Sequence, residues 1–186
     1  MNNNKRIIAV SHCIFNKHSK VESTSPKDPD TTKLLSYLLD KNIGIIQLPC
    51  PEMHMYGIKR WGHVKEQFDT PFFRETSREL LKPFGLQVKD YTNNGYDLIG
   101  IIGIEGSPSC GAFNTCKGPD WGGEFKDIDL VQQKVSTITY TSSKGVFMEE
   151  LENMLNSINI EPIFFGLLGN EVDDLINSLS LHLEGI

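Results

Sequence analysis

Four short apolar runs constrain the fold of this chain more than any other feature of its sequence. Most positions within each run are apolar in succession rather than in alternation, which is typical of strands that are covered on both faces in a parallel sheet. Each run therefore predicts one buried strand. The runs are Ile7–Ser11, Ile43–Leu48, Leu98–Ile104 and Pro162–Leu168.

Helical patterns occupy the stretches between these runs. Thr31–Lys41 places its leucines at helical spacing, with Asp30 as the expected N-cap, and it links the first two strands into a βαβ unit. Phe68–Phe84 is a second expected helix. Within it, Pro71 is a candidate start and Pro83 a candidate end, because proline fits the first turn of a helix and interrupts its interior.

Two further helices are expected in the last quarter of the chain. Gly145–Ile158 has apolar residues on one face, while Glu149, Glu150 and Glu152 are expected to face water. Glu171–Leu183 repeats the apolar spacing. The order of strands and helices predicts a three-layer α/β/α fold with a mostly parallel, Rossmann-like sheet.

We expect residues 1–186 to form a single domain, since a chain of this length typically builds one core. Two segments do not fit the alternation of strands and helices, namely Asn16–Asp30 and Ser107–Lys126. Both are rich in turn-forming or polar residues and begin where an apolar run ends. Long irregular segments at such places are often functional.

The overall charge limits the classes of partner. A formal net charge of -6 argues against nucleic acid, whose phosphates require a basic face. No stretch of about 18 apolar residues is present to span a membrane, and the N-terminal run is too short for a secretory signal. We therefore expect a cytoplasmic protein with a small-molecule partner, and leave a homodimer open.

Three of the four cysteines come directly after predicted strands. Cys13 follows the first strand, Cys50 the second and Cys110 the third. Ligands of open parallel sheets bind at the carboxyl ends of the strands, so we expect these thiols to converge. In a reducing compartment, such cysteines are more often metal ligands or catalysts than disulfides.

Three thiolates leave one coordination position of a metal centre open, which favours a reactive site over a structural one. Zinc with a bound water and a [4Fe–4S] cluster both fit this donor set, and iron is favoured if the substrate offers sulfur. Unconnected buried or surface thiols are the plain alternative. Cys116 is expected to be an ordinary loop residue, with a fourth ligand or a resolving thiol as alternatives.

The motifs around these cysteines resemble those of the thiouracil desulfidase family. They are Ser11-His12-Cys13, Pro49-Cys50-Pro51-Glu52 and Gly106-Ser107-Pro108-Ser109-Cys110-Gly111, and together they span roughly the first two-thirds of the chain. The segment after Cys-Pro-Glu departs from the family pattern, because Met53–Gly62 stands where the family has a Gly-Gly-Leu-Pro-Thr-Pro-Arg type of sequence. The chain therefore looks like a divergent subfamily.

The resemblance implies a [4Fe–4S] cluster held by Cys13, Cys50 and Cys110, with one open iron that binds the sulfur of a thiocarbonyl substrate. It also implies that Glu52 and Ser107 handle protons, with Glu52 activating the attacking water. The expected product is the carbonyl compound, released together with sulfide. The plain interpretations are a surface or helix-capping carboxylate for Glu52 and a turn-starting hydroxyl for Ser107.

Further interpretations remain open from sequence. Trp61, Tyr56 and Arg60 are candidates to line a pocket that stacks a flat heterocycle, while His12 and His54 are expected to be bystanders. The alternative functions are an iron–sulfur protein that carries sulfur, a zinc-binding structural module without catalysis, and a metal-free nucleoside-processing enzyme.

Overall fold

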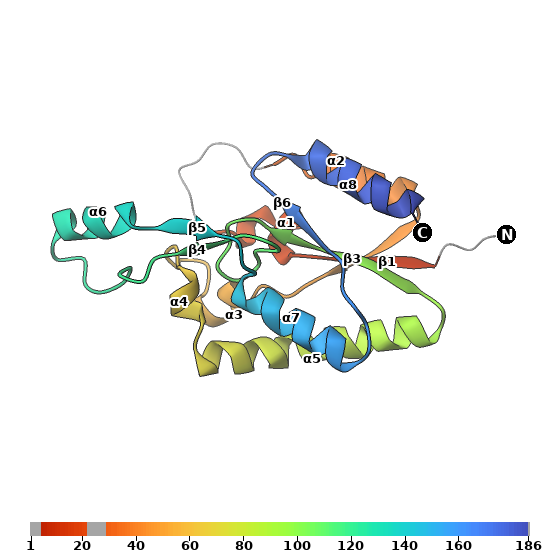
Figure 1. The fold of residues 1–186 in the computed structure, drawn as a ribbon, viewed down its shortest axis with the longest axis horizontal. Coiled ribbons are helices and arrows are strands. Elements are labelled where there is room, and N and C mark those ends of the chain that lie inside the picture. The colour runs from red at the N-terminus through yellow and green to blue at the C-terminus, as the bar shows by residue number, and fades with distance from the viewer. Residues whose placement is uncertain (1–4, 22–28, 186) are drawn as a thin grey trace.

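The computed structural model describes residues 5–21 and 29–185. A sheet of four parallel strands in the order β2-β1-β3-β6 forms its centre (Figure 1). The four apolar runs form these strands, as predicted. Their bounds are Arg6–Val10 for β1, Ile43–Gln47 for β2, Asp97–Ile104 for β3 and Phe164–Leu167 for β6.

Helices cover both faces of this sheet, which confirms the predicted three-layer α/β/α architecture (Figure 1). Successive side chains of a strand point to opposite faces. Ile8 of β1 therefore packs in the core beneath α2 and α8, and Ala9 packs in the core beneath α5 and α7. The bounds are Thr32–Asp40 for α2, Pro71–Asn93 for α5, Val146–Ser157 for α7 and Val172–Glu184 for α8.

Four short helices that the sequence did not predict follow the ends of strands or precede α5. Each is too short to display an apolar period. The segment expected to be irregular over Asn16–Asp30 contains one of them, and its residues 22–28 lie outside the described part of the chain. The four are α1 (His12–Phe15), the 3-10 helix η1 (Lys17–Ser19), α3 (Pro51–Tyr56) and α4 (Lys65–Phe68).

An arm formed by residues 115–141 projects from the body of the molecule (Figure 1). Its antiparallel strands β4 (Thr115–Lys117) and β5 (Thr139–Thr141) flank α6 (Ile128–Ser136). The expectation of an irregular segment over Ser107–Lys126 therefore missed β4. Strands of three residues are too short to show an alternating pattern, and α6 buries none of its residues.

The starts of the two N-terminal long helices lie close to the predicted ones. Helix α2 begins at Thr32 with Thr31 as its N-cap, so the expectation of Asp30 as N-cap is one residue too early, although Asp30 Oδ1 accepts from the amide of Thr32 at 3.1 Å. Helix α5 begins at Pro71, where the hydroxyl of Thr70 accepts from the amide of Phe73 at 3.2 Å. Phe68 belongs to the separate helix α4.

The predicted end of α5 at Pro83 is wrong, since the helix continues to Asn93. Proline removes one helical hydrogen bond and costs about 3 kcal/mol in a helix interior. Phe84 and Val88, which lie beyond it, are buried, and each contributes roughly 1.5–3 kcal/mol by leaving water. Burial of these side chains thus outweighs the cost of the proline.

Across the described residues, no helix, α5 included, combines the length and apolar content needed to cross a membrane.

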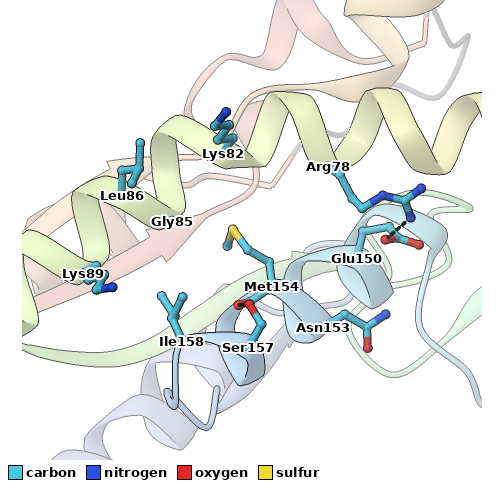
Figure 2. Close-up of a pocket in the computed structure, with 10 residues that line it drawn as sticks. All are labelled: Arg78, Lys82, Gly85, Leu86, Lys89, Glu150, Asn153, Met154, Ser157 and Ile158. Carbon is cyan, nitrogen blue, oxygen red and sulfur yellow. Dashed lines mark hydrogen bonds and ion pairs between the residues drawn. The ribbon is translucent and has the colours of Figure 1, made fainter.

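The acidic side chains of α7 do not all face water, which corrects another expectation. Glu150 is 5% exposed. One carboxylate oxygen accepts from Arg74 at 2.7 Å. The other accepts from Arg78 at 2.9 Å (Figure 2), so that the carboxylate links α7 to α5. Arginines four residues apart share one helix face, and this face of α5 turns toward α7. Glu149 also pairs with Arg74.

We expect Glu150→Ala to lower the free energy of unfolding by about 2–3 kcal/mol, because it leaves two guanidinium groups without their buried partner. Glu75→Ala is the matched control, since Glu75 pairs with Arg78 at an exposed position and such pairs contribute under about 1 kcal/mol. Urea unfolding measures both. Equal losses in the two variants would show that burial of the Glu150 carboxylate has no special weight.

Candidate functional site

The carboxyl ends of β2, β1 and β3 lie side by side at one edge of the sheet, because these strands are parallel neighbours. One cysteine follows each end. Cys13 lies in α1, Cys50 stands directly before α3 and Cys110 lies in the turn after β3. The amide of Ser11 still donates to the carbonyl of Ile102 at 2.9 Å, so the chain before Cys13 leaves the sheet next to β3.

Cys13 and Cys110 lie close enough to neighbouring thiols for the charges of those thiols to raise their pKa. Burial, assisted by the negative charge of Cys50, raises the pKa of Cys13 to about 12. Burial and then the charges of Cys13 and Cys50 hold the pKa of Cys110 well above its usual range. The pKa of Cys50 is raised mainly by burial. The structure therefore brings these thiols together, while their role as ligands stays a prediction.

Three charged groups act on this thiol cluster from outside it. The negative charge of Glu52 raises the pKa of all three cysteines. The ammonium of Lys20 lowers the pKa of Cys13, so this half-buried lysine lies near the cluster. Anion formation at the thiols is therefore opposed by burial and by a carboxylate, and is favoured by Lys20 at Cys13 and by Arg60 at Cys50.

Hydrogen bonds within the turn that carries Cys110 fix its shape. The hydroxyl of Ser107 accepts from the amide of Cys110 at 3.0 Å, and the carbonyl of Ser107 accepts from the amide of Gly111 at 3.1 Å. Ser107 thus has the turn-starting role that a Ser-Pro sequence indicates. Its hydroxyl also lies 3.3 Å from that of Ser109.

Two glycines let neighbouring segments press on this turn. A Cβ atom at Gly103 would lie 2.5 Å from the Cys110 carbonyl oxygen, and one at Gly145 would lie 2.5 Å from the Ser109 carbonyl oxygen. The amide of Phe147 donates to that same Ser109 carbonyl at 3.0 Å. The turn is therefore held between β3 and the start of α7.

Glu52 is buried beside the thiol cluster rather than on the surface. It is 8% exposed and lies in the first turn of α3, two residues after Cys50. Its Oε1 accepts from the hydroxyl of Ser109 at 2.5 Å, and the same hydroxyl lies 3.5 Å from the sulfur of Cys110. Ser109 thus stands between the carboxylate and one thiol.

Arg60 provides the counter-charge of this buried carboxylate. Its Nε donates to Glu52 Oε2 at 3.0 Å. Its other nitrogens donate to the carbonyls of Gly57, at 3.1 Å, and Ser19, at 2.7 Å. The sequence analysis considered Arg60 only as a pocket residue. The structure shows that it holds Glu52 and joins α3 to the end of η1.

Sequence reasoning missed the role of Ser109. Both serines of Ser107-Pro108-Ser109-Cys110 were visible, but only the conformation of the turn decides which hydroxyl faces the carboxylate. The one available signal was that Ser109 is adjacent to Cys110. That signal does not distinguish a side chain turned toward Glu52 from one turned away.

Within the described part of the chain, the remaining candidates form no hydrogen bond with the thiol cluster or Glu52, although the charge of Glu52 also raises the pKa of Cys116. Cys116 lies in β4 and not in a loop, with its thiol 3.4 Å from the carbonyl of His63, and burial raises its pKa to about 11. His54 is exposed, and the ring of His12 contacts Asn16 at 3.1 Å. The bystander role of these histidines stays a prediction.

A preformed site for a single metal ion is not seen. Within residues 5–21 and 29–185, no three His, Cys, Asp or Glu side chains are placed to hold one ion. A tetrahedral zinc site with Zn–S bonds of about 2.3 Å needs sulfur atoms only about 3.8 Å apart. The described thiols share an electrostatic environment without meeting that requirement.

A cavity of about 500 Å³ lies elsewhere, between α5 and α7 (Figure 2). Its walls are largely apolar, with Leu86, Met154 and Ile158 among them, and Lys82 and Lys89 stand along its α5 side. None of the candidate site residues from the sequence lines it. Cavity volume alone therefore does not identify the cysteine cluster as the functional site.

Comparison with known proteins places the chain in a family. Over 154 residues it is 35% identical to the uncharacterized protein MJ0003 of Methanocaldococcus jannaschii, a match that covers 81% of this chain and 97% of that protein. The chain belongs to the family of this archaeal protein. No family model matches the chain, and no solved structure matches it. The chemistry of the family must therefore be argued from residues.

In metal-free protein, we expect alkylation of Cys13 by iodoacetamide to rise about tenfold per pH unit between about pH 9 and about pH 11, because only the thiolate reacts. The reason is its raised pKa of about 12. In the urea-unfolded chain the rise should level off near the ordinary value of 9.0. Mass spectrometry of the Cys13 peptide measures both rates.

The same shift affects stability. The folded state keeps a proton on Cys13 that the unfolded state releases above its ordinary pKa. Protonation of Cys13 therefore contributes fully to the free energy of unfolding below about pH 9. This contribution falls as pH rises toward 12. A Cys13 labelling profile that levels off near pH 9 in the folded protein would contradict the burial and charge environment described for this thiol.

Proposed function

We propose that this protein is a desulfidase that binds a [4Fe–4S] cluster through Cys13, Cys50 and Cys110. It converts a small thiocarbonyl compound, of the thiouracil or thioamide kind, into the carbonyl with release of sulfide. The observation that carries the proposal is the gathering of three thiols, one buried and two half-buried, from three adjacent strand ends. The resemblance of the cysteine motifs to thiouracil desulfidases supplies the reaction class.

The chemistry of the donor set is compatible with such a cluster. Cysteine thiolates are the usual ligands of iron–sulfur clusters, and a closed cluster takes four of them. Cys13, Cys50 and Cys110 would hold the cluster together, and a cluster, unlike a single ion, would not require their sulfur atoms to surround one point. Three thiols supply one ligand fewer than a closed cluster requires.

When bound, such a cluster supplies an open, sulfur-binding Lewis acid. The net reaction consumes one water molecule, forms a C=O bond, breaks the C=S bond and releases hydrogen sulfide without net electron transfer. The protein must therefore remove a proton from water as it attacks carbon, and must return protons to the departing sulfur.

Glu52 and Ser109 are placed to move these protons. The Ser109 hydroxyl already donates to Glu52 Oε1 and contacts the Cys110 sulfur, so it forms a path from the cluster side to the carboxylate. Glu52 accepts the proton of the attacking water through this hydroxyl. Ser107 extends the path by one hydroxyl and holds the Cys110 amide. Arg60 is a positioning residue that fixes Glu52.

The state of the cysteines fits a reducing compartment, which supports a cytoplasmic location in this proposal. Cys13, Cys50, Cys110 and Cys116 are all free. Disulfides form and persist mainly in oxidising compartments. An exposed cluster also requires protection from oxidation, so every experiment on it is anaerobic.

Anaerobic reconstitution with iron and sulfide should give the wild-type protein broad visible absorption. Alanine at position 13, 50 or 110 should abolish most of this absorption and the bound iron, because each change removes one cluster ligand. Cys116→Ala is the matched control and should retain both. Loss of the cluster in Cys116→Ala but not in Cys110→Ala would overturn the ligand assignment, and a colourless zinc-loaded protein would favour the structural module.

Sulfide release from 2-thiouracil and simple thioamides tests the reaction. Glu52→Gln and Ser109→Ala should lower kcat by about 10²- to 10⁴-fold, because each interrupts proton transfer, while the visible spectrum shows that the cluster is retained. Ser107→Ala should lower kcat less, since its main contact is with the Cys110 amide. Glu79→Gln, at an exposed site on α5, is the control.

The outcome separates the alternative functions. Unchanged turnover in Glu52→Gln would remove this residue from the mechanism. A single release of stored sulfide, without turnover of any thiocarbonyl, would favour a sulfur carrier. Full activity in the triple alanine variant of Cys13, Cys50 and Cys110 would favour a metal-free enzyme.

A further inference from the structure

The cavity of about 500 Å³ between α5 and α7 has a size that is typical of small-molecule sites in proteins. Leu86 of α5 and Met154 and Ile158 of α7 provide its apolar surface (Figure 2). Leu86 is 63% exposed, so part of this surface is in contact with water. A ligand that covers it gains the free energy of burying apolar area.

A glycine in α5 shapes the floor of this cavity. Gly85 is buried, and a Cβ atom there would lie 2.5 Å from the sulfur of Met154. Met154 points toward α5 (Figure 2) and takes the space that a larger residue at position 85 would fill. The cavity is therefore a depression between two helices that touch, and not a gap between separated ones.

The cavity carries positive charge that has no partner. Its described lining residues include the basic side chains of Arg78, Lys82 and Lys89, and one acidic side chain, that of Glu150. Glu150 already accepts from Arg78 and from a second arginine of α5. Lys82 and Lys89 are exposed and form no hydrogen bond or ion pair with any other described residue. Two ammonium groups are thus left for an anion.

The two free lysines lie along one face of α5. They are seven residues apart, which places them about 10.5 Å apart along the helix axis, with Leu86 between them. Glu79 and Asp90, the acidic residues nearest to them in sequence, do not line the cavity. In a chain with a net charge of -6, this face therefore presents positive charge at both ends of an apolar segment.

We propose that this cavity binds an aliphatic carboxylate. The chain of the ligand lies against Leu86, Met154 and Ile158, and its carboxylate pairs with Lys82 or Lys89. The free positive charge selects an anion, and the apolar surface selects a saturated chain over a wholly polar anion such as phosphate. The cavity shares no residue with the cysteine site, so this inference goes beyond the proposed desulfidase and does not rest on it.

Calorimetric titration of the full chain with octanoate tests the inference. We expect saturable binding with a Kd below about 1 mM. Hexanoate should bind about tenfold more weakly, because each buried CH₂ group contributes a factor of about four. Octanol keeps the chain of octanoate but lacks its charge, and it should bind several-fold more weakly than octanoate.

Variants locate the site. The double variant Lys82→Gln/Lys89→Gln should bind octanoate about fivefold more weakly and octanol with unchanged affinity, because it removes only the charge. Lys41→Gln is the matched control, since Lys41 is exposed and does not line the cavity. Leu86→Ala should weaken the binding of both ligands several-fold. Leu181→Ala, at a site on α8 that is 71% exposed, should weaken neither.

Three results would overturn the inference: no saturable heat from octanoate in the millimolar range, equal affinity of the wild-type protein for octanoate and octanol, or unchanged octanoate affinity in the double lysine variant. Sedimentation with and without octanoate tests a competing occupant. A dimer that octanoate dissociates would assign the cavity to a second copy of the chain and would also overturn the inference, whereas an association state that octanoate does not change supports the small-molecule site.

Discussion

Parallel pairing of β2, β1 and β3 is the constraint on which the rest of the structure depends. It gives the strands a common direction, so their carboxyl ends and the following loops occupy one edge of the sheet. Cys13, Cys50 and Cys110 are far apart in sequence, yet each needs only a short turn from its strand to reach the others. The gathering of thiols is thus a product of topology and does not require a contiguous motif.

A buried carboxylate at this edge is tolerable only because it is fully partnered. Removing a charge from water costs several kcal/mol unless an opposite charge and hydrogen bonds replace the solvent. Arg60 and Ser109 provide both, one on each oxygen of Glu52. The same two contacts fix the direction of the carboxylate, so the interactions that allow its burial also aim it at the Cys110 turn.

The sequence sufficed for the sheet, its long helices and the placement of cysteines at strand ends, because burial on both faces leaves a strong apolar signal. The sequence failed where tertiary contacts outweighed a local rule. At Pro83, the buried Phe84 and Val88 extend the helix. Glu150 is buried against arginines of another helix. The sequence also failed to choose Ser109, because hydroxyl direction depends on turn geometry. The exposed α6 left no burial signal.

The missing side chains at Gly103 and Gly145 have a mechanical consequence. Backbone touches backbone on both sides of the Cys110 turn, and peptide groups have no rotamers with which to absorb a shift. A translation of α7 is therefore transmitted to the turn instead of being taken up by side-chain repacking. The Cys110 sulfur is thus positioned by strand β3 on one side and by the start of α7 on the other.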